Sequence, residues 1–94
     1  MATVHLPCDG HGTYKIKKIK DKITFDTQGK CNFLSFEFDS PAPASFTDRD
    51  PKTGGGKTIS YQYSGSGIPE DGYPFTYRTD SPMKGNGSGV IKNS

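Results

Sequence analysis

The stretch Asp71-Gly72-Tyr73-Pro74-Phe75-Thr76-Tyr77-Arg78 decides the fold of this chain of 94 residues. Its three aromatic residues alternate with polar or small residues. Because successive side chains of a β-strand point to opposite faces, this alternation predicts a strand with one buried, aromatic face. A glycine-rich segment at 79–87 and a short apolar segment at 88–92 follow it, and they predict a loop and a last strand.

A second alternating stretch covers residues 31–39. A regular strand there places Leu34, Phe36 and Phe38 on one face, toward the core, and it places Phe33 on the opposite face. Two prolines follow closely, and proline lacks the backbone N–H that a central strand donates to its neighbours. The stretch 31–39 is therefore predicted to be a strand that ends at a loop.

The rest of the chain shows the same rhythm of short apolar alternations and turn residues, with no helical period. Further strands are predicted at 3–6, 13–17, 22–25 and 57–63. The segments 40–56 and 64–72 are rich in proline, glycine or charge and are predicted to be loops that carry recognition. The fold class that follows is all-β: an antiparallel Greek-key β-sandwich of about seven short strands, forming one domain over 1–94.

Charge and hydropathy limit the classes of partner. The chain has 12 basic and 10 acidic residues, which is too balanced to indicate nucleic-acid binding, and no stretch approaches the length of a membrane span. We expect an unknown protein or small ligand as partner, with no nucleic acid and no membrane. One local bias exists, because five of the eight residues from Lys15 to Lys22 are lysines. They either form a solvated face that blocks edge-to-edge pairing or contact a phosphate or an acidic partner.

The two cysteines, Cys8 and Cys31, leave two alternatives open. In a cytosolic protein they are usually reduced and often buried as small apolar side chains. In an exported protein a disulfide between them would contribute about 3 kcal/mol to stability. We expect a cytoplasmic protein if Met1 is the native start, and a secreted or periplasmic one otherwise.

Two segments together resemble the cupredoxins, a family of copper-binding β-sandwiches. They are 22–39, a strand, a turn and a strand, and 71–92, a strand, a loop and a strand. In the copper-binding members, one His comes from the strand at 32–35, and a Cys, a second His and usually a Met come from the C-terminal loop. The resemblance therefore implies a cupredoxin-like β-sandwich.

The copper ligands of that family are missing from this chain. The corresponding positions hold residues that cannot ligate copper: Leu34, Arg78 or Thr79, and Ser81 or Pro82. Met83 alone has a counterpart in the family, and a lone thioether does not hold copper. The resemblance thus implies a copper-free relative with no cofactor, and a shared fold does not dictate function.

A candidate metal cluster lies near the start of the chain. His5, Cys8 and His11 provide three ligands of the type that Zn²⁺ or Cu⁺ prefers, within seven residues, and Cys31 offers a fourth. The alternative is an ordinary polar loop that carries two histidines. No sequence feature orients either histidine beside a nucleophile, so we expect no enzyme.

A candidate recognition surface comprises Tyr61, Tyr63 and Arg78. Tyrosine combines a large apolar ring with a polar tip, which suits contact with a protein or a carbohydrate. The alternative is that the tyrosine rings complete a core that is poor in leucine. We expect a non-enzymatic binding or interaction module of unknown ligand. The alternatives are a small metal-binding protein and a secreted inhibitor or carbohydrate-binding domain.

Overall fold

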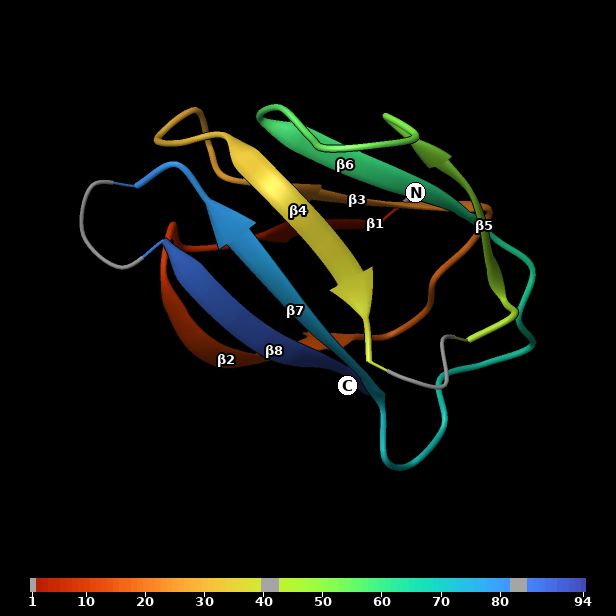
Figure 1. The fold of residues 1–94 in the computed structure, drawn as a ribbon. Helices are drawn as coiled ribbons and strands as arrows, with labels where there is room; N and C mark the ends of the chain where they lie inside the picture. Colours follow the sequence, from red (N-terminus) through yellow and green to blue (C-terminus); the bar gives the residue numbers. More distant parts are fainter. Residues whose placement is uncertain (1, 40–42, 82–84) are drawn as a thin grey trace.

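The computed structural model describes residues 2–39, 43–81 and 85–94, and these contain strands and no helix. The strands form two sheets of four strands that face each other as a sandwich (Figure 1). The all-β, sandwich-like architecture predicted from the alternating stretches is therefore confirmed. The eight strands are β1 (Ala2–His5), β2 (Gly10–Ile16), β3 (Lys22–Asp26), β4 (Phe33–Phe38), β5 (Phe46–Asp50), β6 (Thr58–Tyr63), β7 (Tyr73–Thr79) and β8 (Asn86–Asn93).

The first sheet has the strand order β1-β3-β6-β5 and the second has the order β2-β8-β7-β4. The pairs β1–β3 and β2–β8 are parallel, and the other pairs are antiparallel. The two sheets are thus mixed, which corrects the expectation of a purely antiparallel sandwich. Both parallel pairs place an N-terminal strand at a sheet edge, beside a strand that lies later in the chain.

Strand β4 departs from the predicted alternation at Leu34. The pairing with β7 shifts between Phe33 and Ser35, so β4 carries one extra residue there and the strand is bulged. Phe33 is consequently buried at 2% exposure, whereas Leu34 is 55% exposed. The predicted facing of these two residues was wrong. Phe36 and Phe38, beyond the bulge, face the core as predicted.

Strand β5 lies in a segment that was predicted to be a loop. Phe46 is its only buried hydrophobic side chain, and the four polar or charged residues after it give no apolar alternation. The strand pairs with β6 alone, at a sheet edge, and its register shifts next to Asp48, which has a φ of 51°. Strand β5 is therefore held by backbone pairing with β6 and by the single ring of Phe46. Neither feature produces an alternation of apolar and polar residues in the sequence, so the strand was not predicted.

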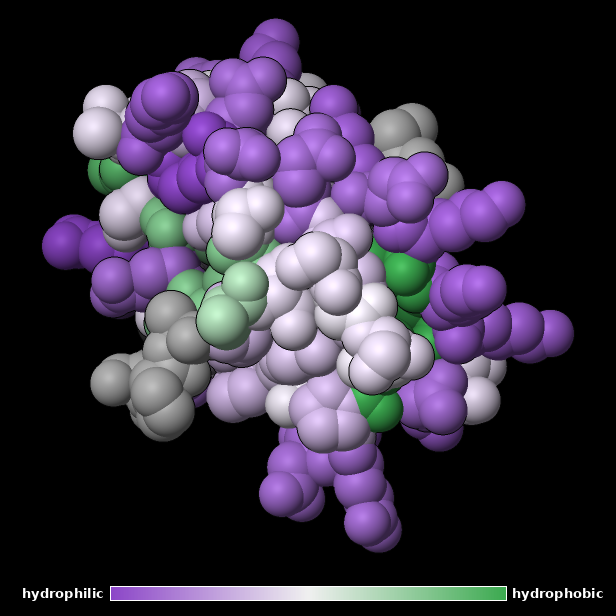
Figure 2. Space-filling view, turned by 90° about the vertical axis from the view of Figure 1, so that its right-hand side faces the viewer, coloured by the Kyte–Doolittle hydropathy of each residue, from purple (hydrophilic) through white to green (hydrophobic). Residues whose placement is uncertain are grey.

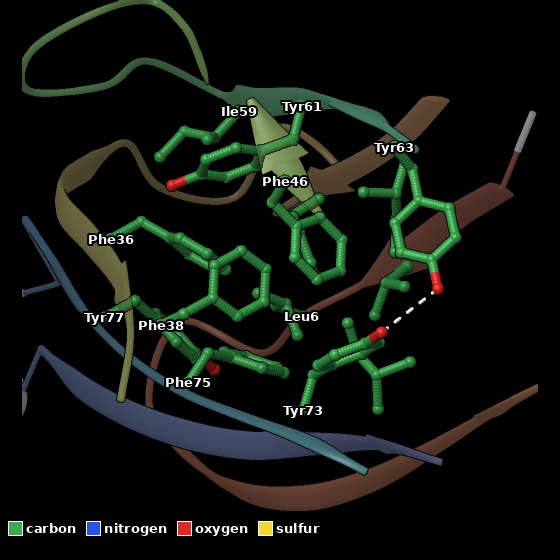
Figure 3. Packing of buried hydrophobic residues seen from close by; sticks show 14 of the residues in the cluster. Leu6, Phe36, Phe38, Phe46, Ile59, Tyr61, Tyr63, Tyr73, Phe75 and Tyr77 are labelled. Carbon is green, nitrogen blue, oxygen red and sulfur yellow. Dashed lines mark hydrogen bonds between the residues drawn. The ribbon is translucent and has the colours of Figure 1, made fainter. Parts of the chain in front are cut away.

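Aromatic rings fill the space between the sheets (Figure 3). The ring of Phe36 on β4 lies 4.5 Å from the ring of Phe25 on β3 and 5.2 Å from that of Phe75 on β7, measured between centroids. These three residues come from both sheets, so their contacts join the two layers. Offset and edge-to-face aromatic pairs of this kind add about 0.5–1.5 kcal/mol each beyond the area that they bury.

A disulfide and two hydrogen bonds hold one end of the sandwich. Cys8 and Cys31 form a disulfide, with 6.1 Å between their Cα atoms, so the cysteines are bonded to each other and not free. The Tyr77 hydroxyl donates to the carbonyl of Pro7 over 2.8 Å, and the Thr79 hydroxyl donates to that of Cys8 over 2.7 Å. The segment before β2 is therefore fixed covalently to the segment before β4 and by hydrogen bonds to β7.

Candidate functional site

A groove of about 420 Å³ lies over the sheet β2-β8-β7-β4. All four strands of this sheet, which extends from β2 to β4 in Figure 1, contribute to it. It is lined by His11, Ser35, Glu37, Thr76, Tyr77, Arg78, Asn86, Gly87 and Ser88. Because all of these strands pair with their neighbours, the groove is built on hydrogen-bonded sheet rather than on loops.

Strand register determines which side chains meet in the groove. Tyr77 on β7 faces the core, so Arg78 next to it faces outward. Arg78 pairs with Ser35 of β4 on one side and with Asn86 of β8 on the other. These three residues form one row of exposed polar side chains across three strands.

A second row runs parallel to the first and crosses all four strands. Thr76 of β7 pairs with Glu37 of β4 and with Ser88 of β8, and Ser88 pairs in turn with His11 of β2. The His11 ring nitrogen Nδ1 is hydrogen-bonded to the Ser88 hydroxyl. Short side chains thus occupy the middle of this row and long ones its two ends, which produces the hollow.

Two charged groups of the groove carry no partner. Neither Arg78 nor Glu37 forms a side-chain hydrogen bond within the described part of the chain, where His5–Asp26 is the one ion pair. The Arg78 guanidinium has five N–H donors, and the Glu37 carboxylate has two acceptor oxygens. Both are exposed, so their hydrogen-bonding capacity is free for water or for a ligand.

The hydrogen-bonded pair of His11 and Ser88 has the composition of a base and a nucleophile but lacks the supporting groups. Among the described residues, no carboxylate contacts the other ring nitrogen of His11. Ser88 lies on β8, whose backbone pairs with strands on both sides, so no free N–H groups remain to stabilise an oxyanion. The pair therefore offers hydrogen bonds and not the machinery of acyl transfer.

The structure separates the three residues of the candidate metal cluster. The Cys8 sulfur is bonded to Cys31, so it is not available as a thiolate. The His5 ring nitrogen Nδ1 donates a 2.6 Å hydrogen bond to the Asp26 carboxylate in one sheet, while His11 is hydrogen-bonded to Ser88 in the other. Residues 2–39, 43–81 and 85–94 contain no group of three or more His, Cys, Asp or Glu side chains placed to hold a metal ion.

The three residues of the candidate recognition surface lie in different environments. Tyr61 and Tyr63 are each 8% exposed and belong to the aromatic core, whereas Arg78 lies in the groove. Burial and the hydrogen bond with Tyr73 raise the pKa of Tyr63 to about 12. The hydroxyls of Tyr63 and Tyr73 are 3.1 Å apart (Figure 3), and the Tyr63 hydroxyl donates to the carbonyl of Gly67 over 2.8 Å. The tyrosines thus anchor the loop at 64–72 to the core.

Some of the positions that correspond to the copper ligands of the cupredoxins lie within the residues that the structure describes, and others do not. Leu34 is exposed on the β4 bulge. Thr79 is buried, and its hydroxyl donates to Cys8. Pro82 and Met83 lie outside the described residues. Asp80, close to this end, accepts two hydrogen bonds from Asn32, and these bonds lower the pKa of its carboxyl.

Comparisons with protein-family models, with curated proteins and with solved structures give no match for this chain. The described part of the chain also contains no helix capable of crossing a lipid bilayer.

Proposed function

We propose that this chain is a non-enzymatic binding module that holds a carboxylated sugar in the groove of the sheet β2-β8-β7-β4. The observation that carries the proposal is the pair of unpartnered charged groups, Arg78 and Glu37, on a rigid polar face with a hollow of about 420 Å³. Strands position these groups more firmly than loops would, and a binding site requires such preorganisation.

The mixture of donors and acceptors favours a hydroxyl-rich ligand. Sugar hydroxyls both donate and accept hydrogen bonds, which suits the Glu37 carboxylate, the Asn86 amide and the Ser88 hydroxyl. The Arg78 guanidinium pairs with a carboxylate through two parallel hydrogen bonds. In the described part of the chain, Leu34 is the one exposed large hydrophobic residue, so the groove exposes no phenylalanine or tyrosine ring for a neutral sugar to stack on, and its exposed ring is the polar imidazole of His11. Recognition therefore depends on hydrogen bonds and charge.

The module is further proposed to be a copper-free, cupredoxin-like sandwich with Greek-key connections. The order of the strands supports this proposal, because β3, a turn and β4 lie within 22–39, and β7, a loop and β8 extend from Tyr73 to Asn93, close to the range 71–92 of the resemblance. The chain crosses between the sheets at every connection except β5–β6 and β7–β8, and repeated crossing of this kind is typical of Greek-key sandwiches. The Cys8–Cys31 disulfide supports residence in an oxidising, exported compartment, where extracellular sugars are available.

The proposal is tested by NMR titration of ¹⁵N-labelled protein with glucuronic acid and, separately, with glucose. We expect glucuronic acid to shift the amide resonances of Thr76, Arg78 and Ser88 with a dissociation constant on the order of 1 mM, and glucose to bind more weakly. The substitution Arg78→Gln is expected to abolish the preference for the acid. Lys52→Gln removes the same charge from an exposed loop position and serves as the matched control.

Two outcomes would overturn the proposal. Shifts confined to residues outside the groove would place the site elsewhere on the molecule. Equal responses of the Arg78→Gln and Lys52→Gln proteins would show that net charge, and not the groove, causes the response to glucuronic acid.

A further inference from the structure

A second hollow lies at the end of the sandwich where the connection 17–21, the loop at 64–72 and the end of β8 meet. It has a volume of about 300 Å³ and is lined by Lys17, Lys18, Ile19, Gly65, Ser66, Gly67, Ile68 and Asn93. Figure 2 looks onto this end of the molecule and shows hydrophilic side chains around a centre of intermediate hydropathy. The hollow is separate from the groove, because the two share no lining residue.

Two lysines without an ion-pair partner, Lys17 and Lys18, line this hollow, and further lysines lie close to them in the chain and across the β2–β8 pair. Lys15, Lys17, Lys18 and Lys20 are exposed, and Lys92 is half-buried beside Lys15, its register partner across the β2–β8 pair. No lysine of the described residues lies within 4.0 Å of a carboxylate, although Asp21 belongs to the same connection and Glu70 and Asp71 to the neighbouring loop. The positive charge of the patch is therefore not neutralised by ion pairs within the protein.

Four of the five lysines follow one another along a single stretch of the chain, and Lys92 lies on the neighbouring strand β8. Lys15 lies on β2, an edge strand, and Lys17, Lys18 and Lys20 follow directly in the connection to β3. A single bound phosphate would need several donors that converge on one position. A row of separate ammonium groups instead suits a linear polymer with regularly spaced negative charges. The Ser66 hydroxyl in the hollow adds a neutral donor next to this row.

We propose that this lysine row, defined by Lys15, Lys17, Lys18, Lys20 and Lys92, binds an acidic polysaccharide. The Cys8–Cys31 disulfide supports this class over nucleic acids, because disulfides persist in the exported compartments where acidic polysaccharides occur. The site goes beyond the groove and does not depend on a ligand bound there.

Other polyanions fit the observations less well. Proteins that bind single-stranded nucleic acids stack the bases on exposed aromatic rings, and this end of the molecule presents none. Proteins that adsorb to membranes combine basic residues with exposed apolar side chains. Leu34, the one exposed large hydrophobic residue in the described ranges, lies on β4 and not in the lysine row.

The test measures the dissociation constant of the full chain for heparin at 50 mM NaCl by isothermal titration, together with its dependence on salt. Each lysine near an anionic surface contributes about a five-fold change in affinity, so Lys17→Ala/Lys18→Ala is expected to weaken binding about 30-fold. It is also expected to make the salt dependence shallower. Lys30→Ala/Lys57→Ala removes the same charge from the opposite end of the sandwich, at the turn after β3 and before β6. This control is expected to change affinity less than two-fold.

Several results would overturn the proposal. They are no binding of heparin at 50 mM NaCl, equal losses in the two double variants, and tighter binding of duplex DNA or of phosphatidylserine vesicles than of heparin. Arg78→Gln separates this site from the groove, because it is expected to leave heparin binding within two-fold of the unsubstituted protein while it abolishes the preference for glucuronic acid over glucose.

Discussion

The bulge in β4 predicts that truncation of two adjacent residues has very different effects on the free energy of unfolding. Phe33→Ala should lower it strongly, and Leu34→Ala should leave it nearly unchanged. Phe33 is 2% exposed, and its ring packs edge-on against Phe36 and Tyr77, with centroids 6.0 and 5.7 Å away. A buried aromatic side chain removes roughly 150–200 Å² from water, which at about 25 cal/mol per Å² amounts to about 4–5 kcal/mol. Part of this area is already buried in the unfolded chain, so we expect Phe33→Ala to cost about 3–5 kcal/mol.

Leu34→Ala removes a side chain that is 55% exposed, and we expect a change in the free energy of unfolding within about 0.5 kcal/mol. Urea unfolding monitored by circular dichroism measures both variants. With an m-value of about 1–1.5 kcal/mol per M for a small domain, Phe33→Ala lowers the midpoint by about 3 M, and Leu34→Ala leaves it nearly unchanged. A larger loss for Leu34→Ala than for Phe33→Ala would refute the bulge, because it would mean that the strand alternates regularly with Leu34 in the core.

Three further predictions concern the disulfide, the close packing of β8 and the pH dependence of stability. The disulfide closes a loop between residues 23 positions apart, so replacing both Cys8 and Cys31 by Ala should lower the free energy of unfolding by about 3 kcal/mol. Urea titrations measure this loss, and an unchanged value would show that the disulfide is absent. Gly87→Ala places a methyl group inside the volume of the facing tyrosine ring and should cost about 1–3 kcal/mol by thermal unfolding, while Gly67→Ala, which meets no atom within 4 Å, serves as its control. Burial raises the pKa of Tyr63 from 10.0 to about 12, so the folded state holds the hydroxyl proton of Tyr63 more tightly than the unfolded state does. The stability that results should be fully present below pH 10 and should be lost as the pH rises toward 12. Urea titrations from pH 8 to 12 should show that the free energy of unfolding falls less steeply with pH in Tyr63→Phe than in the unsubstituted protein. An identical fall in the two proteins would contradict the raised pKa of Tyr63.

Sequence reasoning locates the strands whose apolar residues alternate. The stretches containing β6 and β7 have an aromatic residue or an isoleucine at every second position, and the structure buries those side chains. The same reasoning fails at Leu34, because a bulge adds one residue and no residue type marks its position. It also fails at β5, where backbone pairing at a sheet edge, and not burial, defines the strand.

The groove is harder to predict from sequence than the strands are. Glu37, Thr76, Ser88 and His11 lie far apart in the chain, and each is an ordinary outward-facing polar residue in its own strand. They form one row only because β4, β7, β8 and β2 are adjacent in this order and in this register. Strand order and register depend on pairing over the whole sheet, so a motif search along one segment does not find the row.

Strand β8 connects the packing of the core to the shape of the groove. Its residues from Asn86 to Gly89 alternate between polar residues and glycines. The glycines face inward, where a Cβ at Gly89 would lie 2.8 Å from the ring of Phe75 and one at Gly87 would overlap that of Tyr77. Because the glycines have no side chains, the rings of β7 pack directly against the backbone of β8. The polar residues face outward, and the shortness of the Ser88 side chain leaves the hollow between Arg78 and His11 open. A larger residue at the Ser88 position would therefore fill the groove and leave the core intact, whereas one at either glycine would disturb the core first.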